Sequence, residues 1–288
     1  MHNMQMQYHS RTRVTAASKT LGPRSAELFT ALHERRTRVF TLSDAYDILD
    51  QSRQATVRRV LDQMVDRGLA TRLEPGLYNL VPFELGDATY HVEDPLLIVR
   101  TMMAGRPYFI SHAAAMEVHG LHTQPNLVVT VTSPAFMRSR TIGGIEFRFV
   151  RCQPTQVFGT TTHRVGGVDD VIVSNVERTI VDGLRRPDLC GAMTEVAKAM
   201  WIARRSVDPA LLATYARRLG SGAALRRLGY LSELYGIGNE TELDAIRSSL
   251  TSTYDRFDPT LPAEGVHVAR WRLQMNVSSD ELEEVVRS

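Results

Sequence analysis

The sequence predicts an α+β protein with two domains, and three patterns in its 288 residues support this. Residues 40–82 show two short helical patterns, a polar turn and then a hairpin pattern. Residues 127–132 and 145–151 alternate between apolar and polar side chains, as half-buried strands do. From residue 175 to about residue 250 the pattern is helical. We therefore expect a small N-terminal domain, followed by a larger one with a small, mainly antiparallel sheet and a helical half.

Three helices are expected at the start of the N-terminal domain, the first over about residues 24–36. Thr41 and Asp44 form the T-x-x-D variant of a capping box, which begins the second helix. In the third helix, a rotation of about 100° per residue places four apolar side chains on one inward face. These are Val57, Val60, Leu61 and Met64.

A hairpin is expected directly after the third helix. Gly68 can end that helix, because glycine adopts the left-handed conformation without strain. The strands are expected at 69–73 and 77–81, and Pro75 and Gly76 between them are typical turn residues. This order of elements is that of a winged helix-turn-helix, whose last helix enters the major groove of DNA.

The N-terminal domain is therefore expected to bind double-stranded DNA. Residues 1–82 hold 12 Lys and Arg against 8 Asp and Glu, whereas the whole chain has a net charge of only +2. A positive surplus at this end suits contact with phosphates. The predicted DNA-contacting residues are Ser52, Arg53, Gln54, Ala55, Thr56, Arg58 and Arg59 in the helix, with Arg72 and Tyr78 on the hairpin. A protein-interaction role for the same module is the alternative.

The predicted domain limits are 21–85 for the DNA-binding domain and 86–288 for the C-terminal domain, because the pattern breaks at 83–90. Residues 1–20 lack apolar periodicity and are expected to be a disordered arm. In the C-terminal domain we expect helices at 94–104 and 111–121 and a hairpin at 160–174. A single late strand is expected at 267–275.

Four segments together resemble the AbiEi family, the antitoxins of type IV, abortive-infection toxin–antitoxin pairs. They are the winged-helix region with its Gly-Leu-Tyr hairpin, YFISHAAAMEVHGL (108–121), RTIVDGLRRPDLCG (178–191) and LPAEGVHVARWRLQMNV (261–277). The resemblance covers nearly everything after residue 20. It implies an N-terminal domain that binds inverted repeats in its own promoter and represses the operon. It also implies a C-terminal domain that neutralises a cognate nucleotidyltransferase-like toxin, although no residue there matches a defined toxin-contact motif.

The sequence predicts no catalytic residue, metal site or cofactor. His112 and His119 could share a helix face, but their spacing matches no metal motif. Glu195 and Lys198 come nearest to a nuclease motif, but their spacing is wrong and they lie in a helical pattern. A DNA-processing nuclease is therefore the weakest hypothesis. A transcriptional regulator that binds a small effector at its C-terminal domain is the main alternative to an antitoxin.

Several remaining patterns are expected to be structural. The arginine pairs at 204–205, 217–218 and 226–227 are interpreted as ordinary helix surface, and the acidic helix at 239–250 as a solvated face rather than a toxin-docking surface. Two cysteines make no disulfide framework. The polar start is unlike a signal peptide and no apolar run could span a bilayer, so we expect a cytoplasmic protein.

Overall fold

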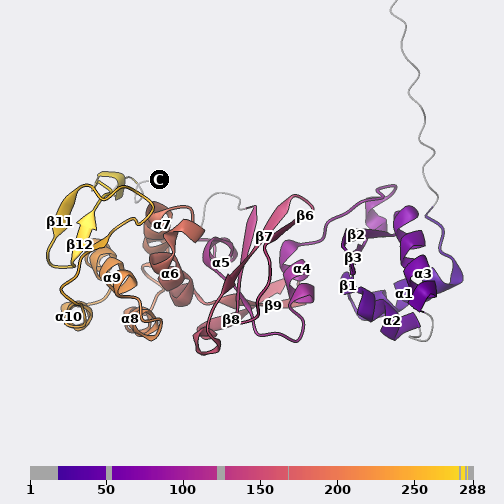
Figure 1. The fold of residues 1–288 in the computed structure, drawn as a ribbon, viewed down its shortest axis with the longest axis horizontal. Coiled ribbons are helices and arrows are strands. Elements are labelled where there is room, and N and C mark those ends of the chain that lie inside the picture. Colours follow the sequence, from indigo (N-terminus) through magenta and orange to yellow (C-terminus); the bar gives the residue numbers. More distant parts are fainter. Residues whose placement is uncertain are drawn as a thin grey trace, which may run out of the picture. The chain divides into compact units, whose positions relative to one another are not determined.

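The computed structural model describes residues 19–49, 54–121, 127–167, 169–278, 280–282 and 284. The chain divides into two compact units, Met1–Glu93 and Asp94–Ser288 (Figure 1). The predicted arm falls almost entirely on residues 1–18, which lie outside the described residues.

Unit 1 contains helices and a small sheet in the expected order, with one additional strand. Its elements are α1 (Pro23–Glu34), β1 (Val39–Thr41), α2 (Leu42–Leu49), α3 (Gln54–Asp66), β2 (Ala70–Glu74), β3 (Leu77–Leu80) and a 3₁₀ turn, η2 (Phe83–Leu85). The sheet has the order β1-β3-β2, and both strand pairs are antiparallel. The extra strand β1 was not predicted, because three residues directly before a helix carry too short a pattern.

The local signals for helix and turn limits are confirmed in unit 1. The Asp44 carboxylate accepts hydrogen bonds from the Thr41 backbone N–H (2.6 Å) and hydroxyl (2.8 Å). The Asp44 N–H in turn donates to the Thr41 hydroxyl at 3.2 Å, which completes the capping box. Gly68 has a φ of 65° after α3, and Gly76 a φ of 84° in the hairpin turn. Both values lie in the region where glycine alone is unstrained.

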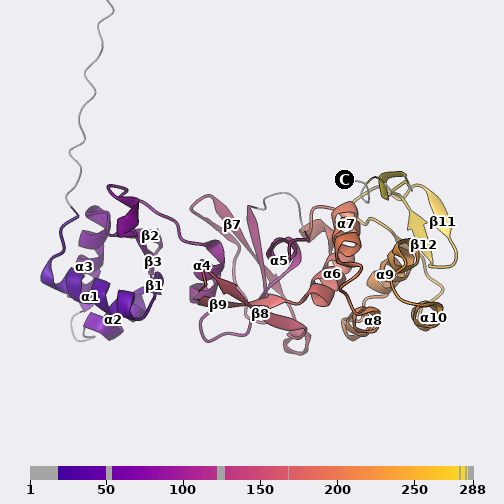
Figure 2. The same ribbon diagram turned by 180° about the vertical axis from the view of Figure 1, so that it is seen from behind.

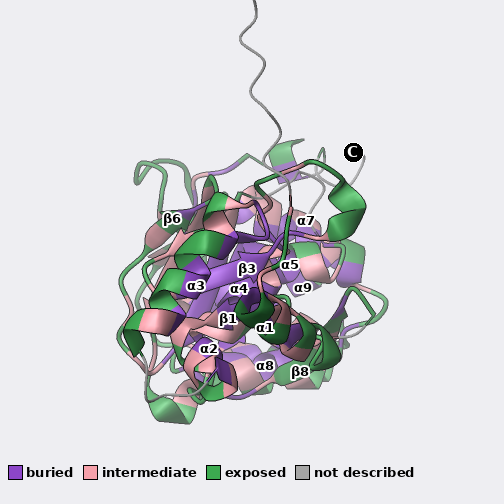
Figure 3. Ribbon diagram, turned by 90° about the vertical axis from the view of Figure 1, so that its right-hand side faces the viewer, coloured by how far each residue is buried: buried purple, intermediate pink, exposed green. Residues whose placement is uncertain are grey.

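The core of unit 1 forms where the three helices pack on the sheet. All four side chains of the predicted inward face of α3 are buried, as expected from their spacing. They pack with Leu28 and Leu32 of α1 and with Phe40 of β1. Figure 3 shows this distribution, with buried residues on β3 and exposed residues along the outer side of α1.

Residues 86–93 follow the hairpin and belong to unit 1. The Asn79 amide donates to the His91 carbonyl at 3.1 Å, and the His91 N–H donates to the Thr71 hydroxyl at 3.0 Å. These bonds hold the segment along β2 and β3, so the division falls at Glu93 rather than at residue 85. The predicted boundary lies at residue 85 because residues 86–93 have no helical or strand periodicity of their own.

The main sheet of unit 2 has six strands in the order β6-β7-β5-β4-β9-β8. They are β4 (Phe109–Ile110), β5 (Val128–Ser133), β6 (Arg140–Ile142), β7 (Ile145–Arg151), β8 (Thr160–Val165) and β9 (Asp169–Ser174). The expected antiparallel pairing holds for three of the five strand pairs. The β5–β7 and β4–β9 pairs are parallel. Strand β6 lies between β5 and β7 in the sequence but at the outer edge of the sheet, where it pairs antiparallel with β7. Because the chain reverses before and after β6, β7 runs in the same direction as β5.

Helices form most of the rest of unit 2, and most of them lie to one side of the six-stranded sheet (Figures 1 and 2). They are α4 (Pro95–Met102), α5 (His112–Val118), α6 (Val176–Arg185), α7 (Met193–Ala203), α8 (Pro209–Arg218), α9 (Gly222–Tyr235) and α10 (Glu240–Arg247), with 3₁₀ turns η3 (Pro154–Gln156) and η4 (Pro187–Leu189). One large apolar cluster joins α6 to α10. Among the described helices, none is long and apolar enough to cross a membrane.

The single late strand predicted at 267–275 is wrong. The chain forms β11 (Val266–Val268) and β12 (Leu273–Met275), which pair antiparallel around a turn, and β10 (Asp255–Arg256) pairs parallel to β12. The turn contains Arg272 with a φ of 53° and places Trp271, which is fully buried, in the helical core. In a continuous strand the side chain of Trp271 would point to one face of the sheet, set by the alternation of neighbouring residues.

Candidate nucleic-acid interface

The solvent-facing side of α3 carries most of the predicted DNA-contacting residues that the structure describes. Gln54, Ala55, Arg58 and Arg59 are exposed, and Thr56 is half-buried. They lie opposite the buried stripe of the same helix. The first two predicted residues, Ser52 and Arg53, lie outside the described residues. The helix therefore presents a mixed polar and basic face with a small residue near its start.

Arg58 is held in place by a residue of the preceding helix. Its Nε donates a hydrogen bond of 3.0 Å to the Tyr46 hydroxyl of α2, and this bond raises the pKa of Arg58. The sequence did not predict a role for Tyr46, because it lies outside the buried stripe of α2, which contains Ala45 and Leu49. The bond limits the rotamers of a long side chain, so less entropy is lost when that side chain binds an anion.

A hollow of about 380 Å³ lies between α3, the start of α2 and the hairpin. Arg58 and Asp62 line it from α3, and Arg72 and Tyr78 line it from the hairpin. Leu42, Pro75 and Gly76 complete the lining. Two arginines from separate elements therefore meet at one concave surface, with one carboxylate beside them. Such a surface fits an anionic group better than a cation.

The prediction that Tyr78 contacts DNA needs correction. Its side chain is only 4% exposed, and its ring stacks on Phe40 with centroids 5.6 Å apart. Tyr78 lies directly across the ladder from Arg72, whose guanidinium carbon is 6.0 Å from the ring centroid. Arg72 itself is exposed. Tyr78 is buried because the whole of β3 is buried, and its ring packs near the guanidinium of Arg72.

The hairpin tip is also tied to the helices. The Leu42 N–H at the start of α2 donates to the Gly76 carbonyl at 2.9 Å. Thr41 pairs with Leu77 in the sheet and also caps α2. The hairpin that carries Arg72 is therefore joined to the start of α2 by backbone hydrogen bonds, and not only by side-chain packing.

The histidines that were considered as metal ligands lie close to polar atoms of neighbouring elements. His112 is buried and its Nδ1 lies 2.9 Å from the Ser111 hydroxyl oxygen. The Nε2 of His119 lies 2.6 Å from the carbonyl oxygen of Ser174. In the described part of the chain, no three His, Cys, Asp or Glu side chains are grouped as a metal site would require.

The interpretation of the 226–227 arginine pair as ordinary surface is wrong. Arg226 and Arg227 are 2% and 3% exposed. Arg226 binds carbonyl and hydroxyl oxygens of Thr251 and Thr253 and pairs with the Asp255 carboxylate at 3.1 Å. Arg227 donates to the carbonyls of Leu184 and Arg256, and burial lowers its pKa to about 10. Both arginines join α9 to segments distant in the sequence.

Comparison with known proteins identifies the fold alone. No family model and no curated protein matches the chain. Among solved structures, the chain is similar to the RV2827C protein from Mycobacterium tuberculosis, with a TM-score of 0.68 and 16% sequence identity. The similarity covers 94% of this chain and 97% of that one. The chain therefore has a mixed α+β fold that is shared over nearly its whole length.

Proposed function

We propose that unit 1 is a winged helix-turn-helix that binds double-stranded DNA, and that the protein is an antitoxin that represses its own operon. One observation carries the DNA-binding part. Arg58 of α3 and Arg72 of the hairpin line the same hollow, beside the exposed polar face of α3. A helix and a hairpin that present cations to one concave surface suit a DNA backbone that passes between them.

In this arrangement α3 enters the major groove. Gln54 and Thr56 would face base edges near the start of the helix, and Ala55 is small enough to permit close approach. Arg59 extends from the same face and can reach guanine or a phosphate. Arg58 and Arg72 would bind phosphates, which fixes the register of the helix without reading the sequence.

The antitoxin part of the proposal rests on the four segments that resemble the AbiEi family. In that reading unit 2 neutralises a cognate nucleotidyltransferase-like toxin, and the protein needs no catalytic group of its own. Unit 1 would bind inverted repeats in its own promoter, which implies two copies of the chain on one operator. The small-molecule regulator with its effector site in unit 2 has no comparable support from the sequence.

The first prediction tests the helix face. We expect the double substitution Arg58→Ala and Arg59→Ala to weaken promoter binding in a gel shift by about 1–3 kcal/mol for each lost contact. The dependence of log affinity on log salt should also become shallower by about one for each phosphate contact removed. The promoter directly upstream of the gene is the probe, at physiological salt.

A matched control is provided by Arg24→Ala combined with Arg35→Ala. Arg24 lies on α1 and Arg35 directly follows it, and both are exposed, so the control removes the same charge from the same unit. We expect it to retain most of the affinity, and thermal unfolding checks that both variants fold. Unchanged affinity of the α3 variant would reject the assignment of α3 as the recognition helix.

A further inference from the structure

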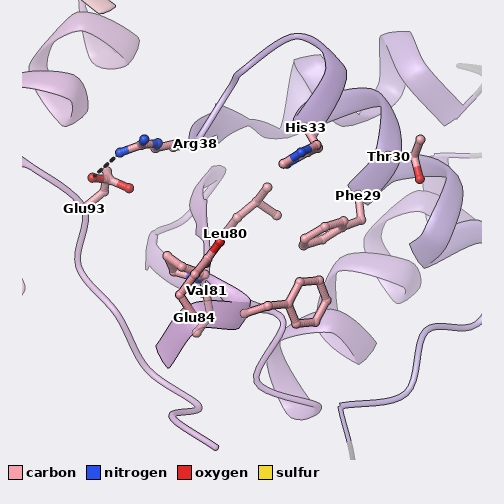
Figure 4. A pocket seen from close by; sticks show the side chains of 10 residues that line it. Phe29, Thr30, His33, Arg38, Leu80, Val81, Glu84 and Glu93 are labelled. Carbon is pink, nitrogen blue, oxygen red and sulfur yellow. Dashed lines mark ion pairs between the residues drawn. The ribbon is translucent and has the colours of Figure 1, made fainter. Parts of the chain in front are cut away.

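Unit 1 contains a second and larger hollow that the proposed DNA contacts do not use. It has a volume of about 540 Å³ and lies between α1, the end of β3, η2 and the last residue of the unit (Figure 4). No residue that lines it belongs to the hollow beside α3. Its volume lies within the range of small-molecule sites in proteins, about 300–1,000 Å³.

One side of this pocket is aromatic and aliphatic. The rings of Phe29 and Phe83 are 4.8 Å apart at their centroids and tilted by 51°. Leu80 and Val81 continue the apolar wall. Phe83 is 45% exposed although it is a large apolar side chain. An exposed ring beside a concave apolar wall is typical of a surface that a ligand covers.

The rest of the lining is charged, with the guanidinium of Arg38 and the carboxylates of Glu84 and Glu93. Figure 4 shows Arg38 on the side opposite Phe29, with a dashed line to Glu93. That ion pair is long, 3.7 Å, and the Arg38 side chain is 52% exposed. The Glu93 carboxylate is nearly buried and also lies 3.6 Å from His91 Nε2. His33 also lines the pocket, and its ring is nearly parallel to the Phe29 ring, with 6.4 Å between the ring centroids.

We propose that this pocket binds a small aromatic carboxylate. Its ring would pack against Phe29 and Phe83, and its carboxylate would bind the guanidinium of Arg38. A planar guanidinium can donate two parallel hydrogen bonds to a carboxylate, which the long pair with Glu93 does not provide. At Glu93 an amine ligand fits less well, because this buried carboxylate already faces Arg38 and His91.

The pocket is connected to the proposed DNA contacts through the sheet. The Arg38 carbonyl accepts a hydrogen bond from the Leu80 N–H at 2.9 Å, and Leu80 lies two residues after Tyr78 on β3. Any effect of the ligand on DNA affinity must be matched by an equal effect of DNA on ligand affinity. This connection rests on the proposed function, whereas ligand binding itself does not.

The test uses the full-length protein in calorimetric titrations with 2-naphthoate as the probe. Two control ligands separate the parts of the site: 2-naphthalenemethanol keeps the rings without the charge, and acetate keeps the charge without the rings. We expect saturable binding of 2-naphthoate with a Kd on the order of 1 mM or tighter. The alcohol should bind at least about tenfold more weakly, and acetate should give no saturable heat.

Two substitutions locate the site. Arg38→Gln should weaken 2-naphthoate binding by about tenfold or more and leave the alcohol unaffected, whereas Arg35→Gln, an exposed arginine outside the pocket, should change neither. Phe83→Ala should weaken both aromatic ligands. Equal binding of acid and alcohol, an unchanged Kd in Arg38→Gln, or no saturable heat from 2-naphthoate would each overturn the proposal.

Because Arg38→Gln also removes the pair with Glu93, a variant that keeps the arginine is needed. Glu93→Gln removes the competing carboxylate, so 2-naphthoate should bind more tightly to it. A weaker affinity in this variant would contradict the proposed role of Arg38.

A gel shift in the presence and absence of 2-naphthoate measures separately whether the ligand changes DNA affinity. Its failure would reject only the coupling, while loss of DNA binding in every condition would reject the proposed function and leave the pocket standing.

Discussion

His112 lies in an unusual environment at the junction of β4 and α5. Like Arg36 and Arg272 in the described part of the chain, it has a positive φ without being glycine, 56°, and its side chain is only 4% exposed. Ser111, whose hydroxyl lies 2.9 Å from His112 Nδ1, also lies 2.8 Å from the Thr132 hydroxyl on β5. Burial lowers the pKa of His112 to about 4, against the opposing influence of the Asp182 carboxylate. The folded protein therefore holds this imidazole neutral at pH 7.

This burial predicts a dependence of stability on pH. Between pH 6.5 and about 4 the unfolded chain binds the His112 proton and the folded chain does not. The free energy of unfolding should therefore fall as the pH is lowered through this window, by up to about 3 kcal/mol from this residue. Urea unfolding at about pH 7.5, 5.5 and 4.5 measures the effect.

The matching variant is His112→Asn, because asparagine tolerates a positive φ and does not titrate. We expect it to be less stable at neutral pH but to lose less stability on acidification than the wild type. If both proteins lose the same free energy between pH 7.5 and 4.5, the loss comes from other groups and the assignment to His112 is wrong.

The sequence predicted the exposed side of α3 well, and it failed where burial depends on distant residues. The helical spacing alone separates Arg58 and Arg59 from the buried stripe. The burial of Tyr78 depends on Phe40, whose strand was not predicted. Arg226 and Arg227 are neighbours in a helical pattern and were expected on the surface. Their partners, the carbonyls of Thr253 and Leu184, lie 27 and 43 residues away, so local spacing carried no signal for them.

At the scale of elements, helix α9 packs closely against the turn between β11 and β12. Gly229 lies in the middle of α9, where a Cβ atom would overlap the buried ring of Trp271. The indole N–H of Trp271 donates to the Glu233 carboxylate one turn further along the same helix. A glycine inside a helix normally lowers its stability, but here the missing side chain makes space for the largest buried residue in the cluster.

Gly229→Ala therefore tests packing against helix propensity. Propensity alone would stabilise the protein by about 1 kcal/mol. We expect the opposite, a destabilisation of about 1–3 kcal/mol, because the close-packed ring of Trp271 must shift. Thermal and urea unfolding measure the difference.

A double-mutant cycle with Trp271→Phe provides the control, since the smaller ring removes part of the overlap. The cost of Gly229→Ala should be smaller in that background. A single variant that is more stable than the wild type would contradict the close approach of α9 and the turn.

Elements with complete local signals were predicted, whereas the direction in which distant strands pair was not. The capping box of α2 and the glycine turn of the β2–β3 hairpin can be read from a few adjacent residues. The parallel pairing of β5 with β7 depends on where β6 lies, which no alternation reveals. The prediction of one continuous late strand was wrong because the turn at Arg272 contains no glycine that would have marked it in the sequence.

At the scale of the whole molecule, the division at Glu93 allows the two proposed roles to be separated. We expect residues 94–288 to protect cells from the cognate toxin without repressing the promoter. Residues 1–93 should retain promoter binding and give no protection. Co-expression with the downstream gene product measures protection, and a promoter fusion measures repression.

Circular dichroism of each purified fragment must first show that it folds. Loss of protection by a folded fragment of residues 94–288 would show that neutralisation needs unit 1, and would contradict the assignment of separate roles. Protection by the intact protein carrying Arg58→Ala and Arg59→Ala serves as the control, because this variant keeps both units and changes only the proposed DNA contacts.

The bond between the hairpin tip and α2 has a consequence for how an operator would be chosen. Thr41 is at once the last residue of β1 and the cap of α2, and Gly76 at the hairpin turn accepts the next N–H. These bonds hold the hairpin tip against the start of α2, so we expect the hairpin to keep one arrangement when it meets different grooves. If DNA binds as proposed, the duplex must supply the bending or groove widening, and its stiffness depends on its sequence. Base pairs that the protein never touches would then help to decide which promoter it occupies.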